Sequence, residues 1–369
     1  MDFRLTDAQT LLVNTAREFL RHRCPPTVVE ESVASERGFS AELWKEISLL
    51  GWPGLLIPPD YGGSGGSLLD VSLLIEEMGR ACFPSPYVQS AVVATSLLVT
   101  AANSTQRERL LPAMARGDRI CTLALTEDSG SFERDGLGLE GEVGGKLAGR
   151  KLFVKDAHVA DDLIVVTRGA AGANLFLLET QRPGVTVLPM ETIAGEKPCE
   201  VSFAGVETRA DDLLGKAGEG WELLSHALRA GALARTAEMV GCAQRILELC
   251  VDHAKARKQF GRPLGSFQAV QHSCADLLRD VEGARYLLYR AAWKMQEGRE
   301  GAADVAMAKA YAGQACQAVA RRAHQLLGAI SFCEEHPLHL FHKRILAATL
   351  DFGDPTHHLE AVATAIGLQ

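Results

Sequence analysis

Apolar residues recur at helical spacing towards both ends of the chain. In the N-terminal part, Leu11, Leu12, Ala16, Phe19 and Leu20 fall on one face of a helix, which is the pattern of an amphipathic helix. In the C-terminal part, apolar positions between residues 239 and 254 keep the same period, and residues 302–327 form a long run rich in Ala and Leu. We therefore predict helices over residues 1 to about 115 and again from about 219 to 369.

Glycines punctuate the N-terminal helical region. Residues 57–66 read Ile-Pro-Pro-Asp-Tyr-Gly-Gly-Ser-Gly-Gly, a composition that predicts a loop. The helical pattern returns from Leu69 to Arg80. Gly79, close to the end of this stretch, fits the glycine that often stops a helix.

The middle of the chain, from about 118 to 215, has a different pattern. Short runs of apolar and β-branched residues cover 122–126, 162–167, 175–178 and 185–188, and Gly, Asp, Pro and Asn separate them. This punctuation is typical of β-strands. Because no long helical pattern interrupts the runs, we expect a β domain and not a parallel sheet with crossover helices.

Composition excludes several classes of function. The 369-residue chain carries a net charge of −8, which argues against a basic face for nucleic acid. No apolar run is long enough for a membrane span, and the N-terminus lacks a secretory signal pattern. Nine scattered cysteines without a C-x-x-C pair predict reduced, mostly buried thiols in a cytoplasmic protein, with neither a zinc site nor a disulfide framework.

Two motifs are better explained by structure than by chemistry. Gly136-Leu137-Gly138-Leu139-Glu140-Gly141 matches G-x-G-x-x-G, but no helical pattern follows it, so we interpret it as a turn between strands and not as a dinucleotide fingerprint. His336, His339 and His342 are spaced by three residues, yet Pro337 lies among them and no acidic residue shares the spacing. We therefore expect no metal.

The segment Arg257-Lys258-Gln259-Phe260-Gly261 follows a long amphipathic helix. Taken alone, it fits a cationic helix end with a glycine cap. The residues after it extend the pattern to Arg257-x-x-Phe260-Gly261-x-Pro263-x-Gly265-x-Phe267-Gln268. With this extension the chain resembles the acyl-CoA dehydrogenase family of flavoproteins over essentially its whole length. Four further segments resemble family motifs in the right order: Pro59-Asp60-Tyr61-Gly62-Gly63 with Glu76-Glu77-Met78-Gly79-Arg80, Leu125-Thr126-Glu127, Gly149-Arg150-Lys151, and Gln325-Leu326-Leu327-Gly328.

The resemblance implies a mostly α fold with a central β domain. It implies an N-terminal helical domain over residues 1–117, a middle β-barrel over 118–216 and a C-terminal four-helix bundle over 217–369. It also implies FAD as cofactor, an acyl-CoA thioester as substrate, a homo- or hetero-tetramer and an electron-transferring flavoprotein as acceptor. The implied reaction is α,β-dehydrogenation, in which a carboxylate takes the α-proton and a β-hydride leaves to the flavin.

The resemblance also assigns candidate site residues. The flavin ring rests against Leu125, Thr126 and Phe153. Arg257 is a charge partner for the cofactor pyrophosphate. The remaining cofactor candidates are Phe260, Gln268, Gln325, Gly328 and Gly353, and part of this set serves the FAD of a neighbouring subunit.

The catalytic base departs from the family pattern. The common family base is a Glu directly before Gly-Thr, and Phe352 stands at that position when the chain is aligned on Gly353. The alternative position, 26 residues before Arg257, holds Gly231. Phe153 replaces a frequent Trp beside the flavin, and Lys155 replaces a hydroxyl residue, where it either favours reduced anionic flavin or points to solvent.

Four interpretations therefore stay open. The chain is a base-lacking subunit of a two-gene heteromer that acts on bulky thioesters such as steroid side-chain CoA esters. Or it is a self-sufficient dehydrogenase that uses Asp351 or Asp354 as base, with the backbone N–H of Phe352 donating to the thioester oxygen. Against that, Asp351 and Asp354 also fit helix-capping positions. Other flavin chemistry and a non-enzymatic scaffold complete the set.

Overall fold

The computed structural model describes residues 3–298 and 301–368, which fold into two compact units. The first unit combines Met1–Glu30, Leu68–Phe83 and Ala232–Gln369. The second unit combines Glu31–Ser67 and Pro84–Gly231. The division into three domains at residues 117 and 217 stays a prediction.

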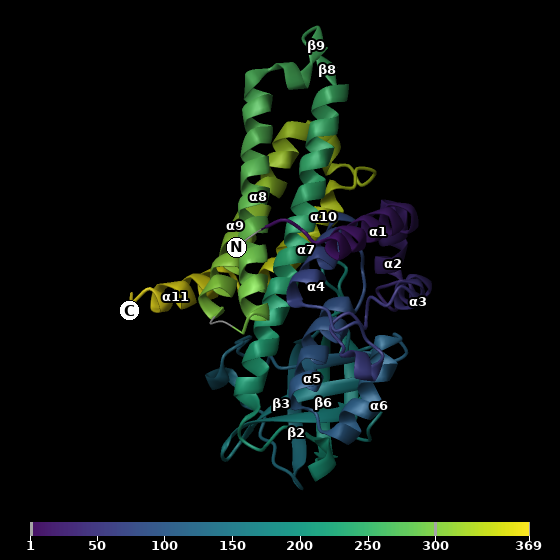
Figure 1. Ribbon diagram of the computed structural model, residues 1–369, viewed down its shortest axis with the longest axis vertical. Coiled ribbons are helices and arrows are strands. Elements are labelled where there is room, and N and C mark those ends of the chain that lie inside the picture. The colour runs from purple at the N-terminus through teal and green to yellow at the C-terminus, as the bar shows by residue number, and fades with distance from the viewer. Residues whose placement is uncertain (1–2, 299–300, 369) are drawn as a thin grey trace. The chain divides into compact units, whose positions relative to one another are not determined.

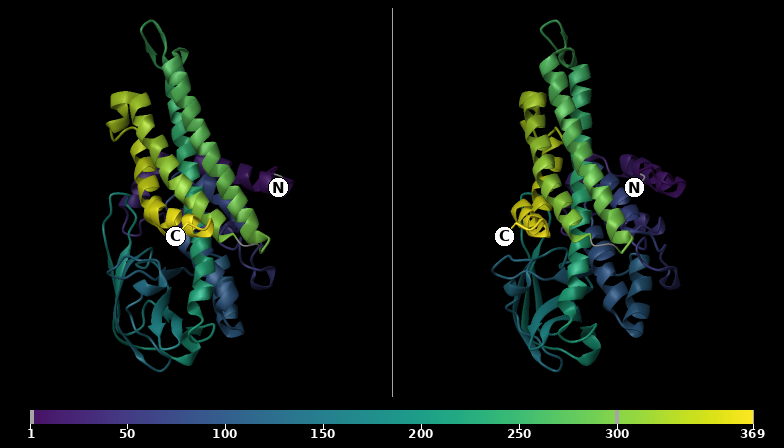
Figure 2. Two further views of the ribbon diagram at one scale, coloured as in Figure 1. Left: turned by 90° about the vertical axis from the view of Figure 1, so that its left-hand side faces the viewer. Right: turned by 60° about the vertical axis from the view of Figure 1, so that its left-hand side comes forward.

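The first unit is helical (Figures 1 and 2). Its N-terminal segments form α1 (Asp7–Arg23) and α4 (Leu68–Arg80), and α2 (Pro26–Ala34) starts at its edge. Its C-terminal part holds most of α7 (Gly220–Ala256), then α8 (Gln268–Gln296), α9 (Ala302–Leu327), α10 (Leu338–Leu350) and α11 (Pro355–Ala365). These bounds confirm the long helix predicted over 302–327 and the bundle expected in the last third of the chain.

Helices α4 and α7 cross at two glycines. A side chain on Gly241 of α7 would begin 1.9 Å from the carbonyl oxygen of Glu76, and one on Gly79 of α4 would begin 2.2 Å from that of Glu238. The prediction that Gly79 stops its helix is wrong, because α4 continues to Arg80 and Gly79 lies inside it. Glycine is needed at position 79 because the backbone of α7 leaves no room for a side chain, and not because the chain turns there.

The second unit contains the β domain. One sheet has the order β1-β3-β4-β7 and the other the order β2-β6-β5. Among the paired strands of the described residues, β1 and β3 run parallel and the other pairs are antiparallel, and the segment between β1 and β3 holds β2 and the 3-10 turn η3 (Arg134–Gly136) but no α-helix. The strands are β1 (Cys121–Ala124), β2 (Lys146–Val154), β3 (Asp162–Gly169), β4 (Gly172–Glu179), β5 (Val185–Pro189), β6 (Cys199–Glu207) and β7 (Leu213–Leu214), which confirms the four predicted runs.

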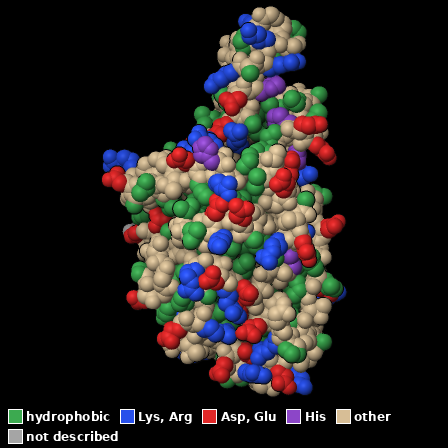
Figure 3. Space-filling model, turned by 90° about the vertical axis from the view of Figure 1, so that its right-hand side faces the viewer, with side chains coloured by type: hydrophobic (Ala, Val, Ile, Leu, Met, Phe, Trp, Pro, Cys, Tyr) green, Lys and Arg blue, Asp and Glu red, His purple; other side chains and the backbone are tan. Residues whose placement is uncertain are grey.

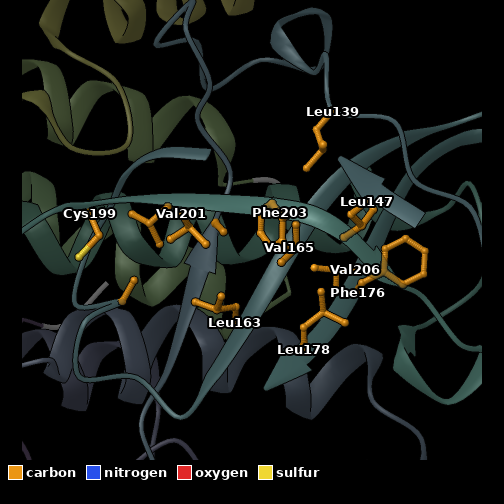
Figure 4. Packing of buried hydrophobic residues seen from close by; sticks show 13 residues of the cluster. Leu139, Leu147, Leu163, Val165, Phe176, Leu178, Cys199, Val201, Phe203 and Val206 are labelled. Carbon is orange, nitrogen blue, oxygen red and sulfur yellow. The ribbon is translucent and has the colours of Figure 1, made fainter. Parts of the chain in front are cut away.

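The two sheets enclose one apolar core (Figure 4). Alternate residues of β6 point into it, with Cys199, Val201 and Phe203 at most 3% exposed. Leu163, Val165, Phe176 and Leu178 come from the other sheet. The same unit includes α3 (Ala41–Leu49), the π-helix η2 (Val88–Ala94), α5 (Thr95–Ala101), α6 (Ser104–Ala115) and the short turn η1 (Pro59–Tyr61) within the predicted loop.

The structure bears on the predictions about membrane spans and about the cysteines. Among the described residues, no helix is long and apolar enough to cross a membrane. All nine cysteines lie in the described part of the chain, none forms a disulfide, and only Cys274 and Cys333 are not buried. The prediction of mostly buried thiols is confirmed.

We expect Gly241→Ala to destabilise the first unit by about 1–3 kcal/mol, because its Cβ overlaps the backbone of α4. At an exposed helix position the same change stabilises by about 0.5–1 kcal/mol. Urea unfolding measures the difference. The control His272→Ala, at an exposed position of α8, should stay within about 0.5 kcal/mol, and a Gly241→Ala variant as stable as this control would contradict the close crossing.

Candidate active site

Leu125 and Thr126 extend β1 and are fastened to β2. Both are buried. The Thr126 hydroxyl donates to the carbonyl of Leu152, and the Leu152 N–H donates back to the carbonyl of Thr126 at 2.8 Å. These two bonds fix the predicted flavin-ring segment against the second sheet.

An ion pair between Lys151 and Glu127 supports the same segment. Lys151, fully buried, donates to the Leu125 carbonyl at 3.0 Å and to Glu127 at 2.5 Å. Glu127 in turn accepts the backbone N–H groups of Gly138 and Leu139. The Thr-Glu and Gly-x-Lys motifs thus contact each other and stabilise the same segment.

The segment 136–141 has no helix after it, as predicted, and it lines a cleft of about 520 Å³.

Phe153 presents an aromatic ring on the surface of this unit. Its side chain is 56% exposed, and its φ of +55° is left-handed. The pairing register of β2 and β6 shifts between Lys151 and Val154, so Phe153 lies on a bulge. Lys155 does not point freely to solvent, because its ammonium group pairs with Glu196.

The Arg257 motif forms the tip of the helix pair α7 and α8 (Figure 1). After α7 ends at Ala256, β8 (Lys258–Gln259) pairs with β9 (Arg262–Pro263). Phe260 and Gly261, between the strands, have φ of +56° and +80°, which is a type I′ hairpin turn. The glycine-cap explanation of Gly261 is therefore wrong, since the residue serves the hairpin.

The hairpin exposes basic and aromatic groups together. Phe260 is 88% exposed, and the Arg262 guanidinium lies 4.0 Å from the centre of the Phe267 ring. Arg257 and Gln268 are also exposed. Figure 3 shows Lys and Arg side chains at this tip.

The Gln325 and Gly328 turn ends α9. Gly328 has φ of 70° and ψ of −149°, a conformation essentially restricted to glycine. A side chain there would meet nothing within 4 Å, so the backbone conformation and not crowding requires glycine. Gln325 is exposed. This turn and the hairpin lie towards the same end of the bundle (Figures 1 and 2).

The turn between α10 and α11 carries Asp351, Phe352 and Gly353. Phe352 has φ of +58° and is 7% exposed. Its carbonyl faces Nε2 of His358 at 2.9 Å. Lys309 of α9 donates to the carbonyls of Thr349 and Gly353 at 2.8 and 3.0 Å. Lys309 from α9 and His358 from α11 therefore hold the strained turn.

Asp351 lies in an ion-pair network inside the helical unit. Its carboxylate is 2.8 Å from Arg235 of α7, whose guanidinium also contacts Glu238 at 2.6 Å. Glu238 has a second cationic neighbour, Arg344, at 3.4 Å. Asp354 caps α11 by accepting the N–H of His357 at 2.9 Å, which confirms the predicted helix start at Asp354-Pro355.

Burial changes the titration of two groups at this turn. It lowers the pKa of Lys309 to about 7, with Asp351 opposing the shift and Arg235 adding to it. Burial, together with the positive charge of Lys309, lowers the pKa of His358 to about 4. Sequence reasoning missed Lys309, Arg235 and His358. A lysine inside the Ala-rich run 302–315 was an available signal, since lysine is rarely fully buried without partners.

Comparison with known proteins explains this arrangement. Residues 6–118 match the model of the acyl-CoA dehydrogenase N-terminal domain, and residues 218–367 match that of the C-terminal domain. The chain is 31% identical over 356 residues to a short-chain specific acyl-CoA dehydrogenase of Megasphaera elsdenii, with 92% of each protein covered. The chain belongs to the acyl-CoA dehydrogenase family.

Two solved structures in this family's fold are informative. The ChsE4–ChsE5 complex from Mycobacterium tuberculosis has a TM-score of 0.92 and 27% identity, with both chains covered completely. The FAD complex of PigA has a TM-score of 0.89 and 25% identity, again over the full length of both. The mostly α fold with a central β domain is thereby confirmed, and family membership together with an FAD-bound neighbour implies a flavin cofactor.

The residues of this acyl-CoA dehydrogenase family member fit such a cofactor chemically. Cationic donors for a diphosphate are available on Arg257, Lys258 and Arg262. Gly328 has no side chain and lies close in sequence to the exposed amide of Gln325. Phe153, Leu125 and Thr126 supply an aromatic and apolar surface with one hydroxyl. The two sets belong to different compact units, and their roles in binding stay predictions.

The Lys309 titration gives a test of the buried turn. A lysine with a pKa of 10.5 unfolded and about 7 folded binds more protons in the unfolded state between these values, so the free energy of unfolding should rise with pH across this window. The slope is at most about 1.4 kcal/mol per pH unit.

Lys309→Met removes this contribution, and urea unfolding between pH 7 and 10 measures it. The variant should lose the rise that wild type shows. Lys146→Met, at an exposed lysine of β2, is the control and should keep the wild-type slope. Parallel curves for wild type and Lys309→Met would contradict the burial of an uncharged amine.

Proposed function

We propose that this chain is the base-lacking subunit of an FAD-dependent heteromeric acyl-CoA dehydrogenase. The assembly converts an acyl-CoA thioester to its trans-2-enoyl form, and the substrate is a bulky acyl group such as a steroid side chain. One observation carries the proposal: Phe352 stands directly before Gly353, and the adjacent carboxylate of Asp351 is bound to Arg235 at 2.8 Å.

The reaction requires a carboxylate that removes the substrate α-proton. It also requires donors for the thioester oxygen, because negative charge develops there as the proton leaves. Bound FAD supplies the acceptor for the β-hydride. In this chain the backbone N–H of Phe352 is the proposed donor, and Lys309 and His358 fix the turn that carries it.

Asp351 is poorly suited to act as the base. The Arg235 guanidinium lies 2.8 Å from the carboxylate, so an oxygen that would have to take the proton already faces a cation. Proton transfer needs the two heavy atoms within about 3 Å, or one bridging water. Asp351 would have to leave Arg235 to accept a proton, and that would leave a buried guanidinium with less compensation. A self-sufficient enzyme that uses Asp351 is therefore the second candidate, favoured only by the closeness of Asp351 to Phe352 in sequence.

The proposed partner is a paralogous subunit that bears the missing carboxylate. A solved complex of two named components with a TM-score of 0.92 supports such an assembly. The exposure of Arg257, Phe260, Gln268 and Gln325 in the isolated chain also supports it, since a second subunit would cover them. The proposed assembly is a tetramer, and its proposed electron acceptor is an electron-transferring flavoprotein.

Asp351→Asn separates the two candidates. In a base-lacking subunit the Asp351 carboxylate takes no part in proton transfer, and the amide keeps an oxygen beside Arg235, so turnover of the co-expressed assembly per bound FAD should stay within about twofold of wild type. Turnover with an artificial electron acceptor, and substrate α-proton exchange, measure this. Asp354→Asn, at the α11 cap, is the control. A large loss for Asp351→Asn alone, with an unchanged flavin spectrum, would assign Asp351 as the base.

Phe352→Glu should give the isolated chain activity. The substitution places a carboxylate before Gly353 and exchanges one non-glycine residue for another at a positive φ. A general base contributes about 10²–10⁴-fold. We therefore expect at least about tenfold more turnover than in Phe352→Gln, a control of similar shape without a basic carboxylate. Equal activity of the two FAD-loaded variants would contradict the assignment of position 352.

A further inference from the structure

A histidine near the end of α9 and another on α10 share one hydrogen bond. Nε2 of His324 lies 3.1 Å from Nδ1 of His342 on α10, and the ring centres are 5.2 Å apart. The other nitrogen of His324, Nδ1, lies 3.0 Å from the hydroxyl of Ser331. The His324 ring also stacks on Phe332 at 4.7 Å. Figure 3 shows histidine side chains gathered below the hairpin at this end of the unit.

Ser331 sets the direction of this chain of hydrogen bonds. Its side chain is 1% exposed, and its Oγ lies 2.7 Å from the carbonyl oxygen of Gly328. A carbonyl only accepts, so Ser331 uses its one hydrogen there and must accept from His324. Nδ1 of His324 therefore carries a hydrogen. In the neutral ring Nε2 is then an acceptor, and Nδ1 of His342 donates to it.

This chain of hydrogen bonds, here called the relay, runs from His342 through His324 and Ser331 to the Gly328 carbonyl. It tolerates one added proton, because a protonated His342 still donates through Nδ1. A second proton gives both rings hydrogens on the facing nitrogens, which then oppose each other at 3.1 Å with two like charges. The pair cannot keep its geometry in that state.

The surroundings also disfavour a second proton. Arg321 of α9 and His324 itself act on His342, and burial lowers the pKa of both rings. His336, in the α9–α10 connection, interacts with His324, with His339 of α10 and with His253 of α7. Arg257 lies near His253. Glu30 places a carboxylate 3.8 Å from His339.

Gly328 is the far end of the relay, and its conformation is the strained one that closes the turn after Gln325. We propose that His324 and His342 are positioning residues for the Gln325–Gly328 turn, and that they hold it through Ser331 only while the two rings carry at most one extra proton. This inference rests on the proposed function and on the predicted contact of that turn with FAD. Acid should then weaken FAD binding through this pair.

His342→Asn tests the relay. An asparagine amide donates from about the position of Nδ1 but does not titrate in this range. At pH 8 the FAD-loaded assembly should keep the wild-type amount of flavin per chain, measured by absorbance after gel filtration. Between pH 8 and 5, wild type should lose FAD, whereas His342→Asn should lose it at a midpoint at least about one pH unit lower.

Two further variants bracket this result. His342→Leu has no donor and should retain less FAD at every pH. His339→Asn is the matched control, because His339 faces the carbonyl of Glu334 at 3.1 Å and lies outside the relay. It should lose FAD as wild type does. The same midpoint for wild type and His342→Asn would overturn the inference.

A second readout is independent of the cofactor. Imidazole nitrogen NMR of the full chain at pH 8 should show His324 with its hydrogen on Nδ1, and the Nε2–H form would overturn the relay. A chain that takes up no FAD at pH 8, even when assembled with its partner, would instead overturn the proposed function and the claim about FAD. The NMR result would still decide the hydrogen-bond direction.

Discussion

The left-handed backbone of Phe352 is the constraint on which the proposed catalytic turn depends. A bulky residue in this conformation costs of order 1–3 kcal/mol, and it persists because several distant groups fix the turn together. Lys309 holds the carbonyls on both sides, His358 faces the carbonyl of Phe352 itself, and Arg235 holds the adjacent Asp351. The turn is thus set by α7, α9 and α11, and not by its own sequence.

Strained backbone also marks the other candidate regions. In the described part of the chain, five residues other than glycine have a positive φ: Cys82, Phe153, Asp156, Phe260 and Phe352. Three of these are phenylalanines that the family resemblance assigns to cofactor or catalysis. Their positions on a strand bulge, in a hairpin turn and in a helix connection share no local structure. Strain at functional positions is a recognised association, and it supports these three assignments independently of the motifs.

Most of the fold could be predicted from the sequence because it depends on local periodicity. The long helix over residues 302–327 and the four short strands follow directly from the spacing of apolar residues. Gly79 and Gly261 were misassigned because their roles depend on partners that spacing does not show. Gly79 faces a helix more than 150 residues later in the chain, and Gly261 belongs to a hairpin of only two residues per strand. The Arg235–Asp351 pair, which decides whether Asp351 can act as a base, likewise joins distant segments.

The crossing of α4 and α7 fixes which residue of each helix faces the other, because only glycine fits at Gly79 and Gly241. Adding or removing one residue in α7 before Gly241 would turn everything after it by about 100°. Bare backbone would then no longer face Glu76, and a side chain would take its place. Changes in chain length near this point have to fall outside α7, for example in residues 215–219 before it. The two glycines therefore fix the rotation of α7 about its axis. This rotation directs Arg235 towards Asp351.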